Sequence, residues 1–308
     1  MEKIAAVVVT YNRFELMKKT IAALRMQTRQ LNSIIVIDNH CTDGTGEWLD
    51  AQDDLTVIHQ ENVGGSGGFW RGIKEAYERG FDWIWCMDDD VFPREECLER
   101  LMVNGNGVTV NERKIGILCP HRIMNGKTFT GESKRVNLSN PFKNTFDYPL
   151  TAEDVENNEV VDIEGMAFEG PLIKREVVEK IGLRNKELFI LYDDTDYSYR
   201  AILAGYRVVV VRDALMDKHY FQSTLSYKED KMKNKWKLAY HIRNSAYICH
   251  KYGKNVFVRY GGALPFVLKM YGAITFNFFK GHKYKFSDYG LFASAVKRGI
   301  KGELGKLE

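Results

Sequence analysis

Paired cysteines, long apolar runs and low-complexity tracts are all missing from this sequence of 308 residues. Its five cysteines are odd in number and no two form a CxxC pair, which argues against a disulfide framework or a structural zinc site and favours a reducing compartment. The longest apolar run, residues 265–279, contains Lys269 and is shorter than the ~20 residues that cross a bilayer. The first residues turn polar too soon for a signal peptide. We therefore expect a cytoplasmic protein without a transmembrane helix.

Acidic residues are scarce in the last part of the sequence. Residues 218–308 hold 18 Lys and Arg against 5 Asp and Glu, whereas residues 1–217 hold 26 against 36. One interpretation is a solvated basic helix face. The main alternative is peripheral contact with an anionic membrane surface, on the inner face of the cell membrane, because Lys and Arg with interleaved aromatic residues suit the headgroup region. A nucleic-acid partner is not expected, since no recognised nucleic-acid module accompanies the basic region.

Strand-like and helix-like patterns alternate along the first 120 residues. Residues 4–10 are a continuous run rich in β-branched side chains, typical of a strand that is buried on both faces. Residues 14–27 have apolar positions at helical spacing, and Pro93 suits the first position of a helix. Further strands are predicted at residues 33–38, 55–59, 82–87 and 115–119, and a further helix over 68–79 after a glycine-rich turn. The alternation predicts an α/β fold with a mostly parallel sheet and helices on both faces.

The second half of the sequence predicts a less regular arrangement. Residues 121–160 are polar and loop-like, and from about residue 222 the sequence is helical and aromatic. Between them we predict helices over 174–181 and 194–204, the latter closed by Gly205 as a C-cap, and strands over 187–191 and 206–211. The sequence therefore predicts an α/β domain over residues 1–221 and a helical C-terminal region over residues 222–308.

Polar residues directly follow several of the predicted strands. Arg13, Asp38, Asn62 and the run 88–90 all lie just after a strand. Ligands of open parallel sheets bind outside the carboxyl ends of the strands. We therefore expect these residues to form part of one ligand-binding edge.

Four glycines surround Ser66 in the stretch ENVGGSGGFWRG, residues 61–72. Glycine lets the backbone approach a ligand closely, and free N–H groups at a helix start suit phosphate. The stretch is not a Walker loop, because no Gly-Lys-Ser/Thr follows, and it is not the dinucleotide fingerprint, whose third glycine would fall on Trp70. A tight strand-to-helix turn is the alternative interpretation. Arg71 would add a positive charge for a diphosphate or be an ordinary surface arginine.

Three aspartates stand side by side in CMDDDVFP, residues 86–93. Two unit charges 4 Å apart near a protein surface repel by about 4 kcal/mol, so the crowding suggests a bound cation. In an extended segment Asp88 and Asp90 point one way and Asp89 the other. Two carboxylates at a strand end favour Mg²⁺ or Mn²⁺ over zinc. Helix capping would explain one of the three acids but not all of them.

A second acidic pair, Asp193 and Asp194, lies in LFILYDDTDYSYRA, residues 188–201. Acids at a helix N-terminus are favoured by the helix dipole, so capping alone is one explanation. The functional alternative is a general base that accepts the proton of an acceptor hydroxyl. His219, in MDKHYF just beyond the last buried strand, is a candidate third metal ligand, although a lone histidine is more often structural.

Together these motifs resemble the family-2 inverting glycosyltransferases of the GT-A fold, a Rossmann-like α/β fold. The resemblance rests on VVVTYNR at 7–13, VIDNHCTDGT at 36–45, NVGGSGGF at 62–69, MDDD at 87–90, YDDTDYSYR at 192–200 and His219. NVGGSGGFWRG resembles the galactofuranosyl- and rhamnosyltransferase branch in particular, as do, more weakly, YHIRN at 240–244 and VKRGIKGELGK at 296–306. Residues 1–221 would then be the nucleotide-sugar-binding and catalytic domain, and residues 222–308 a region for contact with the acceptor or a membrane surface.

The resemblance implies a role for each matching residue. Asp88 and Asp90 would hold Mn²⁺ or Mg²⁺ together with His219, and Asp194 would be the catalytic base. The donor-binding set would be Thr10, Arg13, Asp38, Asn62, Gly64, Gly65, Ser66, Gly67, Gly68, Arg71 and Asp89, with Asp38 accepting from the nucleobase. Glu-Asp is common at the base motif in this family, whereas this sequence has Asp193-Asp194, which leaves the choice of base between the two open.

The activity that the resemblance implies is metal-dependent transfer of a sugar, with inversion, from a nucleotide diphosphate to a saccharide acceptor. The acceptor would be lipid-linked and the product a cell-surface polysaccharide. UDP-galactofuranose is the favoured donor and dTDP-rhamnose the alternative. A non-catalytic glycan or sugar-nucleotide binding module is another class; such a module would be expected to lose the paired aspartates or the base, and this sequence keeps both.

Overall fold

The computed structural model describes residues 2–105, 113–146, 148–221, 235–279 and 287–307. The chain divides into two compact units. The sheet unit consists of Met1–Lys134, Pro149–Lys186 and Asp193–Tyr220, and the helical unit of Arg135–Tyr148, Glu187–Tyr192 and Phe221–Glu308. The sheet unit ends for the last time at Tyr220, one residue before the predicted domain boundary at residue 221. Two short segments that the sequence analysis assigned to the α/β domain belong to the helical unit instead.

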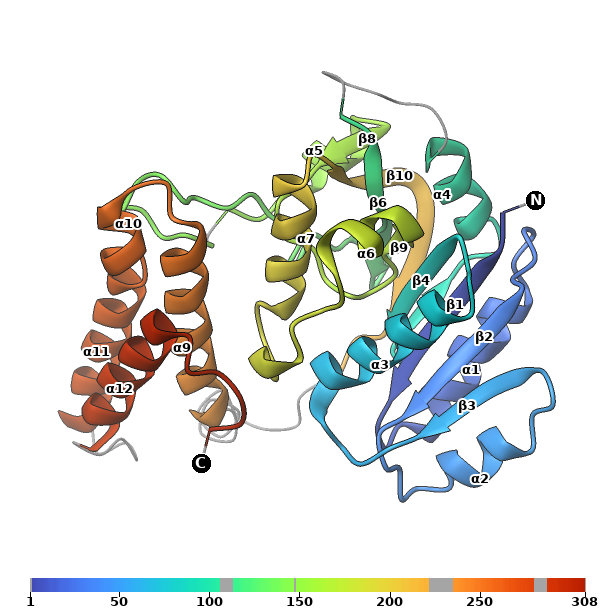
Figure 1. The fold of residues 1–308 in the computed structure, drawn as a ribbon, viewed down its shortest axis with the longest axis horizontal. Coiled ribbons are helices and arrows are strands. Elements are labelled where there is room, and N and C mark those ends of the chain that lie inside the picture. Colours follow the sequence, from blue (N-terminus) through green and yellow to red (C-terminus); the bar gives the residue numbers. More distant parts are fainter. Residues whose placement is uncertain (1, 106–112, 147, 222–234, 280–286, 308) are drawn as a thin grey trace. The chain divides into compact units, whose positions relative to one another are not determined.

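Within the described residues, a ten-stranded sheet runs through the sheet unit (Figure 1). Its strands are β1 (Ile4–Thr10), β2 (Ser33–Asp38), β3 (Leu55–His59), β4 (Trp83–Asp88), β5 (Val91–Pro93), β6 (Ile115–Met124), β7 (Lys127–Thr128), β8 (Val160–Asp162), β9 (Leu172–Lys174) and β10 (Arg207–Lys218). They are ordered β3-β2-β1-β4-β9-β6-β10-β5, with β7 beside β6 and β8 beside β10. The first four are parallel, as are β6 and β10, whereas β9 is antiparallel to both of its neighbours. The α/β class is confirmed, and the second half of the sheet is mixed.

Helices cover both faces of the sheet (Figure 1). They are α1 (Phe14–Arg25), α2 (Thr45–Asp50), α3 (Gly64–Glu78), α4 (Cys97–Gly105), α5 (Ala152–Glu156), α6 (Arg175–Ile181) and α7 (Asp193–Leu203). Alternate residues of β1 enter different cores: Val7 lies in one with Ile73 of α3, and Val8 lies in the other with Ile21 of α1. Because both faces are covered, every position of β1 is apolar or small, which explains the continuous run in the sequence.

The glycine-rich stretch is the first turn of α3, which begins at Gly64 rather than at the predicted Gly68. A Cβ added at Gly68 would lie 2.6 Å from a methyl carbon of Val9, and one added at Gly72 would lie 2.2 Å from a methyl carbon of Val7. Any larger residue at these positions would push the helix away from β1. Glycine therefore lets α3 pack directly on the sheet.

Two predicted elements differ in the structure. Pro93 ends the short strand β5 instead of opening a helix, and α4 begins at Cys97. β5 is the edge strand beside β10, where a residue without an N–H group is tolerated. The predicted strand over 187–191 is instead a 3₁₀ turn, Lys186–Leu188, followed by residues with positive φ. Its carbonyl groups accept hydrogen bonds from the side chain of Asn244 rather than from a neighbouring strand.

The helical unit contains the predicted C-terminal helices. They are α9 (Lys235–Tyr252), α10 (Val256–Gly261), α11 (Leu264–Phe279) and α12 (Ser287–Lys301), and residues 222–234 lie outside the described part. Their core consists of Ile242, Val267, Ile274, Phe292 and Ala295. Among the described residues, none of the helices has both the length and the apolar character that a membrane span requires.

Candidate active site

The carboxyl ends of the parallel strands bring several candidate residues to one edge of the sheet. Thr10 and Asp38 are register partners at the ends of β1 and β2, and Asp38 is in turn paired with His59 of β3. Asp88, the last residue of β4, is paired with Val9. Since parallel strands run in the same direction, their terminal side chains share an edge, where ligands bind in sheets of this kind.

Asp89 is fixed by residues around the start of α1. Its carboxylate accepts hydrogen bonds from Thr10 Oγ1 at 2.7 Å and from Arg13 Nη1 at 2.8 Å, while its carbonyl accepts from Thr20 Oγ1 at 2.9 Å. Burial raises the pKa of Asp89, although Arg13 and Thr10 act in the opposite direction. Arg13 also lies 3.1 Å from Asp90, and 40% of its side chain is exposed. The two aspartates therefore anchor an arginine that a ligand can still reach.

Asp88 and Asp90 form a carboxylate cluster with Glu169. One oxygen from each of the three lies within 4.8 Å of the others. Burial, with repulsion from Asp90, Glu169 and Asp89, raises the pKa of Asp88 well above its usual range. Within the described residues, the buried Oδ1 of Asp90 has no hydrogen-bond partner. A divalent cation would relieve both conditions, and an all-oxygen ligand set is the one that Mg²⁺ and Mn²⁺ prefer, so these residues fit the predicted metal.

Glu169 is a site residue that the sequence analysis missed. Arg122 pairs with one of its oxygens and Lys218 Nζ lies 2.6 Å from the other. Burial acts to raise the pKa of Glu169, but Arg122 and Lys218 outweigh it and lower that pKa. Lys218 Nζ also lies 3.6 Å from Asp90. The signal in the sequence was weak: Glu169 precedes a short strand by a few residues, and Lys218 adjoins His219 in MDKHYF.

His219 contacts the acidic segment through its backbone. Its N–H donates to the carbonyl oxygen of Asp90 at 2.9 Å. Among the described residues, the cluster of potential ligand atoms includes Glu169 and not His219. Ligation by His219 stays a prediction, and Glu169 becomes a further candidate for the third ligand.

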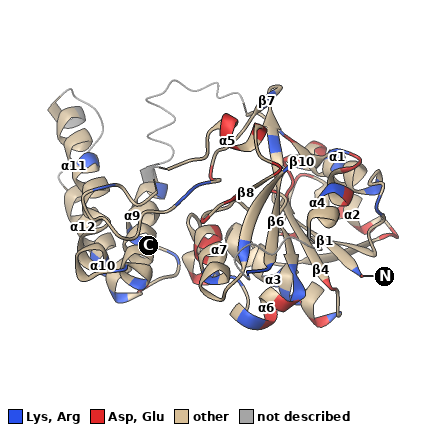
Figure 2. Ribbon diagram, turned by 90° about the horizontal axis from the view of Figure 1, so that it is seen from above, with Lys and Arg blue, Asp and Glu red and all other residues tan. Residues whose placement is uncertain are grey.

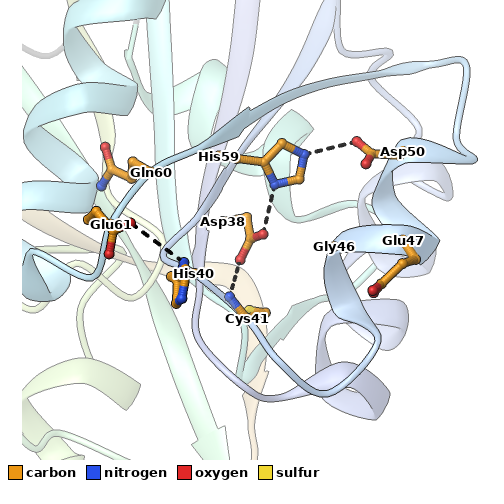
Figure 3. Close-up of a pocket in the computed structure, with 9 residues that line it drawn as sticks. All are labelled: Asp38, His40, Cys41, Gly46, Glu47, Asp50, His59, Gln60 and Glu61. Carbon is orange, nitrogen blue, oxygen red and sulfur yellow. Dashed lines mark hydrogen bonds and ion pairs between the residues drawn. The ribbon is translucent and has the colours of Figure 1, made fainter.

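A cavity of about 500 Å³ opens beside Asp38, at the ends of β2 and β3 (Figure 3). Asp38 Oδ1 accepts from the N–H of Cys41 at 2.8 Å, and Oδ2 lies 2.8 Å from His59 Nδ1. The other ring nitrogen of His59 lies 2.9 Å from Asp50, so the imidazole bridges two carboxylates and its pKa is raised by them. Burial opposes the effect, yet the hydrogen bonds from Cys41 and His59 lower the pKa of Asp38. The lining residues are Asp38, His40, Cys41, Gly46, Glu47, Asp50, His59, Gln60 and Glu61.

The chemistry of this cavity suits the N–H groups of a nucleobase better than a phosphate. Its lining offers carboxylate and amide oxygens as acceptors and, as far as the described residues go, contains no lysine or arginine. Acceptors of this kind pair with ring N–H donors, whereas clustered carboxylates repel an anion.

The start of α3 is exposed only at its first residues. Asn62 Oδ1 accepts from the N–H of Gly64 at 3.0 Å. Gly65 is exposed, and a Cβ added there would meet no atom within 4 Å. Gly64 and Gly65 therefore lie open to a ligand, whereas the other predicted members of the stretch, Ser66, Gly67 and Gly68, are buried.

Two other side chains of α3 have partners within the sheet unit. The hydroxyl of Ser66 donates to the carbonyl of Asn185 at 3.1 Å, which ties the start of α3 to the segment before α7. Arg71 Nη2 lies 3.5 Å from Glu75 on the same helix. A contact between Arg71 and the donor stays a prediction.

The acidic pair opens α7, and its two carboxylates have different surroundings. Asp193 is buried and forms an ion pair with Arg184. Asp194 is less buried, and its Oδ1 accepts from the N–H of Thr195 at 2.6 Å. Burial, with repulsion from Asp193 and Glu132, raises the pKa of Asp194 to about 7. A carboxylate that titrates near neutral pH suits a general base, whereas Asp193 is committed to Arg184.

Known proteins resemble this chain in both sequence and fold. Residues 5–104 match the family described as Glycosyl transferase family 2. The chain is 27% identical to galactofuranosyltransferase GlfT1 of Mycolicibacterium smegmatis over 219 residues, which cover 66% of this chain and 67% of the relative. It is 28% identical to dTDP-rhamnosyl transferase RfbF of Shigella flexneri over 227 residues, 69% and 68% of the two chains. A solved structure of GalNAc-T7 with UDP, GalNAc and Mn²⁺ matches with a TM-score of 0.56 at 15% identity.

That structural match covers 82% of this chain and 52% of GalNAc-T7, so this chain spans about half of that protein. The fold is that of GT-A glycosyltransferases. The family match and the relatives named as glycosyltransferases make the chain a glycosyltransferase. More particularly, residues 5–104 are a glycosyltransferase family 2 domain, with relatives named as galactofuranosyl- and rhamnosyltransferases.

Proposed function

We propose that this glycosyltransferase is metal-dependent and inverting, and that it transfers galactofuranose from UDP-galactofuranose to a saccharide acceptor. The observation that carries the proposal is the cluster of Asp88, Asp90 and Glu169 at the sheet edge, with the exposed guanidinium of Arg13 beside it. The similarity to GlfT1 supports the choice of sugar. The structural neighbour is described with UDP and Mn²⁺, which supports a nucleotide–metal pair at this edge.

Asp88 and Asp90 would hold Mn²⁺ or Mg²⁺, with Glu169 or His219 nearby as a third ligand. When bound, the cation supplies charge that stabilises a diphosphate leaving group. Arg13, which Asp89 orients, would add a hydrogen-bonding cation on the same side. The open N–H groups at Gly64 and Gly65 would contact the ribose or the diphosphate.

The nucleobase would enter the cavity beside Asp38. Asp38 and its neighbours present acceptors there, and both uracil and thymine carry a ring N–H donor that fits them. The imidazole of His59 fixes the orientation of the Asp38 carboxylate. The cavity therefore supports a uridine or deoxythymidine nucleotide, without distinguishing between the two.

Asp194 would accept the proton of the acceptor hydroxyl as this hydroxyl attacks the anomeric carbon. A single displacement from the face opposite the leaving group inverts the configuration, and it passes through an oxocarbenium-like state related to that of glycoside hydrolysis. Asp193 would instead keep its ion pair with Arg184. No covalent intermediate with the enzyme is required.

A rhamnosyltransferase that uses dTDP-rhamnose is the second candidate. The observation that favours it is the similarity to RfbF of Shigella flexneri, which covers about as much of the chain as the similarity to GlfT1. The same residues would act in the same roles, and only the nucleotide and sugar would differ.

The helical unit supports a lipid-linked acceptor at a membrane surface. Leu264, Leu268, Phe276 and Phe279 follow one another along α11 at spacings that place them on one face, and they are 53–81% exposed. Basic residues outnumber acidic ones in residues 218–308 by 18 to 5, and those of the described helices are visible in Figure 2. Exposed apolar residues with surrounding basic charge favour contact with an anionic membrane surface, here as a peripheral contact.

Thermal melting with UDP and with dTDP, each with and without Mn²⁺, tests the nucleotide and the metal together. A ligand at 100 times its dissociation constant stabilises the folded state by about 2.7 kcal/mol, which raises the melting temperature by several degrees. A Mn²⁺-dependent rise with UDP alone supports the galactofuranosyl donor, and a rise with dTDP alone supports the rhamnosyl donor. No rise with either nucleotide would contradict the proposed donor site.

A further inference from the structure

Residues 188–192 form a strained segment directly before α7, the helix that carries the proposed base Asp194. Phe189, Leu191 and Tyr192 have φ values of 65°, 66° and 64°, a left-handed conformation that non-glycine residues rarely adopt. Strain of this kind persists only where the surroundings fix it, and it is concentrated at functional sites. The segment ends one residue before α7 begins at Asp193, so it leads straight into Asp194.

The motif YHIRN, residues 240–244 on α9, contacts this strained segment. The ring of Tyr240 stacks on that of Phe189, with 5.3 Å between the ring centroids and 25° between the planes. The hydroxyl of Tyr192 lies 2.9 Å from Nε2 of His241. Phe189 and Tyr192, near the two ends of the segment, therefore both contact aromatic side chains from one turn of α9.

Asn244 bonds the backbone of the segment directly. Its Nδ2 donates to the carbonyl oxygens of Leu188 at 3.1 Å, Ile190 at 2.8 Å and Leu191 at 2.9 Å. An amide group has two N–H bonds, so the three carbonyls share them. The three carbonyls converge on one amide, an arrangement that a regular helix or strand would not present.

Arg243 orients the amide of Asn244. Arg243 Nε donates to Asn244 Oδ1 at 2.9 Å, and Nη2 donates to the carbonyl of Leu188 at 3.2 Å. The amide oxygen is thereby turned towards the guanidinium, which leaves Nδ2 facing the segment. Both side chains are fully buried, and burial lowers the pKa of Arg243 to about 10. Burying a guanidinium against carbonyl oxygens is unfavourable unless it is well hydrogen-bonded, so the arrangement is a specific one.

We propose that Arg243 and Asn244, with Tyr240 and His241, are positioning residues for the catalytic base. They hold the strained segment in the one conformation from which α7 starts with Asp194 in place to accept a proton. They act through the backbone and touch neither donor nor metal. The inference rests on the proposed function, in which Asp194 is the base, and it gives the YHIRN motif a role.

A double-mutant cycle tests this role. We expect Asn244→Ala to lower kcat by about 10-fold or more. The dissociation constant for UDP with Mn²⁺ should stay within about twofold of the wild-type value, because the residues proposed to bind the nucleotide lie in the sheet unit. In an Asp194→Asn background the same substitution should lower kcat by less than about threefold, because residues that act as one unit are not additive. Fully additive losses, or a loss of UDP affinity as large as that of kcat, would overturn the positioning role.

Asn255→Ala is the matched control. Asn255 caps α10 in the same helical unit, since its Oδ1 accepts from Val258 N–H at 3.0 Å and its Nδ2 donates to the carbonyl of Ser139 at 2.8 Å. We expect it to lower the melting temperature and leave kcat at the wild-type value. An equal loss of kcat in Asn255→Ala would show that any destabilisation of this unit reduces the rate, and the inference would fail.

Tyr192→Phe is a milder variant in case Asn244→Ala does not fold. It removes the hydroxyl that contacts His241 and keeps the ring, so we expect a fall in kcat of about 2- to 10-fold, the scale of one hydrogen bond, without a change in UDP affinity. A wild-type kcat in both folded variants would overturn the inference. If Asp194→Asn keeps the wild-type rate, the base assignment itself fails; if Asp194→Asn is inactive while Asn244→Ala is fully active, only the positioning role fails.

Discussion

The three neighbouring aspartates of residues 88–90 have different partners in the structure. Asp89 forms an ion pair with Arg13 and accepts a hydrogen bond from Thr10, whereas Asp88 and Asp90 lie beside Glu169. Within MDDD, Asp89 and Asp90 therefore both hold Arg13, while Asp88 and Asp90 suit a cation. The sequence analysis paired Asp88 with Asp90 by assuming an extended chain, whereas Asp89 and Asp90 form a turn between β4 and β5. It did not predict Glu169, which lies 79 positions from Asp90 and reaches the cluster only through the fold.

Asp88→Asn is expected to abolish the response to metal and to stabilise the metal-free protein. The folded state raises the pKa of Asp88, so the ionised carboxylate destabilises the fold as pH rises above the pKa of the unfolded chain, and asparagine removes that penalty. We predict a melting temperature higher by about 1 °C or more at pH 7, no gain in strong acid, and transfer lower by at least about 10²-fold. Differential scanning calorimetry and a transfer assay measure the two effects.

The control for this substitution is Asp213→Asn. Asp213 is an exposed residue of β10 whose pKa is lowered by a hydrogen bond from Arg212. This variant should gain no stability and should keep its metal response. A destabilised Asp88→Asn protein with normal turnover would contradict both the repulsion and the metal site.

The pH dependence of the rate should report Asp194. Its pKa is raised to about 7, so the ionised form that acts as a base accumulates, and kcat rises, as the pH passes through 7. The same raised pKa makes the folded state lose stability as the pH rises from about 4 to 7. Glu132→Gln removes one source of repulsion and should move the inflection to lower pH. Asp194→Asn should lose at least about 10²-fold in kcat with donor affinity retained. A flat profile between pH 5 and 9 would contradict the assignment.

At the scale of elements, the glycines of α3 have two different surroundings. The buried glycines Gly68 and Gly72 allow close contact with β1, while Gly65 lies open at the helix start. The sequence showed the glycines but not where the helix begins, because four glycines have low helix propensity and read as a turn. Packing against β1 overrides that propensity. The strained segment before α7 was misread in the same way, since its conformation depends on distant Asn244.

Alanine at two of these glycines should separate packing from binding. Gly68→Ala places a Cβ 2.6 Å from Val9, and we expect a loss of about 1–3 kcal/mol in the free energy of unfolding. Gly65→Ala meets no atom, so it should leave stability unchanged or raise it by up to about 1 kcal/mol, while weakening UDP binding. Urea denaturation and calorimetric titration measure the two quantities. If Gly65→Ala binds UDP normally, this turn does not contact the donor.

The exposed face of α11 predicts binding to anionic vesicles. Replacing Leu264, Leu268 and Phe276 by glutamine removes its apolar side chains without adding charge. We expect the triple variant to lose most of its flotation with vesicles that contain 30% phosphatidylserine, because apolar insertion and basic charge act together.

A matched control replaces three exposed apolar residues of the sheet unit, Met26, Val103 and Leu203, which are 60–67% exposed. That variant should float like the wild type. Equal flotation of both variants would remove α11 as the contact. A loss in both would indicate that replacing any exposed apolar side chains reduces flotation.

At the scale of the whole molecule, the sequence predicted the fold class and the class of enzyme, and several of its candidate residues lie together at one edge of the sheet. These predictions rested on local patterns: continuous apolar runs such as residues 4–10, and polar residues directly after a strand. Such patterns can be read from residues adjacent in the sequence. Contacts between distant segments are not local. The Arg122–Glu169–Lys218 group, the His59 bridge between Asp38 and Asp50, and the Asn244 contacts with residues 188–191 all required the structure.

The uneven charge of the chain is also a property of the whole molecule. Acidic residues are concentrated in residues 1–217, where they form the Asp88–Asp90–Glu169 carboxylate cluster and line the cavity beside Asp38, and basic residues prevail in residues 218–308. We interpret the acidic part of the chain as the region that binds the donor, and the basic part as the region that meets the acceptor. Salt should therefore weaken vesicle binding more than it weakens binding of UDP with Mn²⁺.

The most direct test of the central claim is a transfer assay with UDP-galactofuranose and a galactan acceptor, before and after removal of divalent metal by a chelator. The account predicts UDP release and a product of inverted anomeric configuration, loss of both on chelation, and recovery when Mn²⁺ or Mg²⁺ is returned. Asp88→Asn should not recover. Transfer that continues at full rate in the chelated protein would contradict the assignment of the Asp88–Asp90–Glu169 cluster as a catalytic metal site.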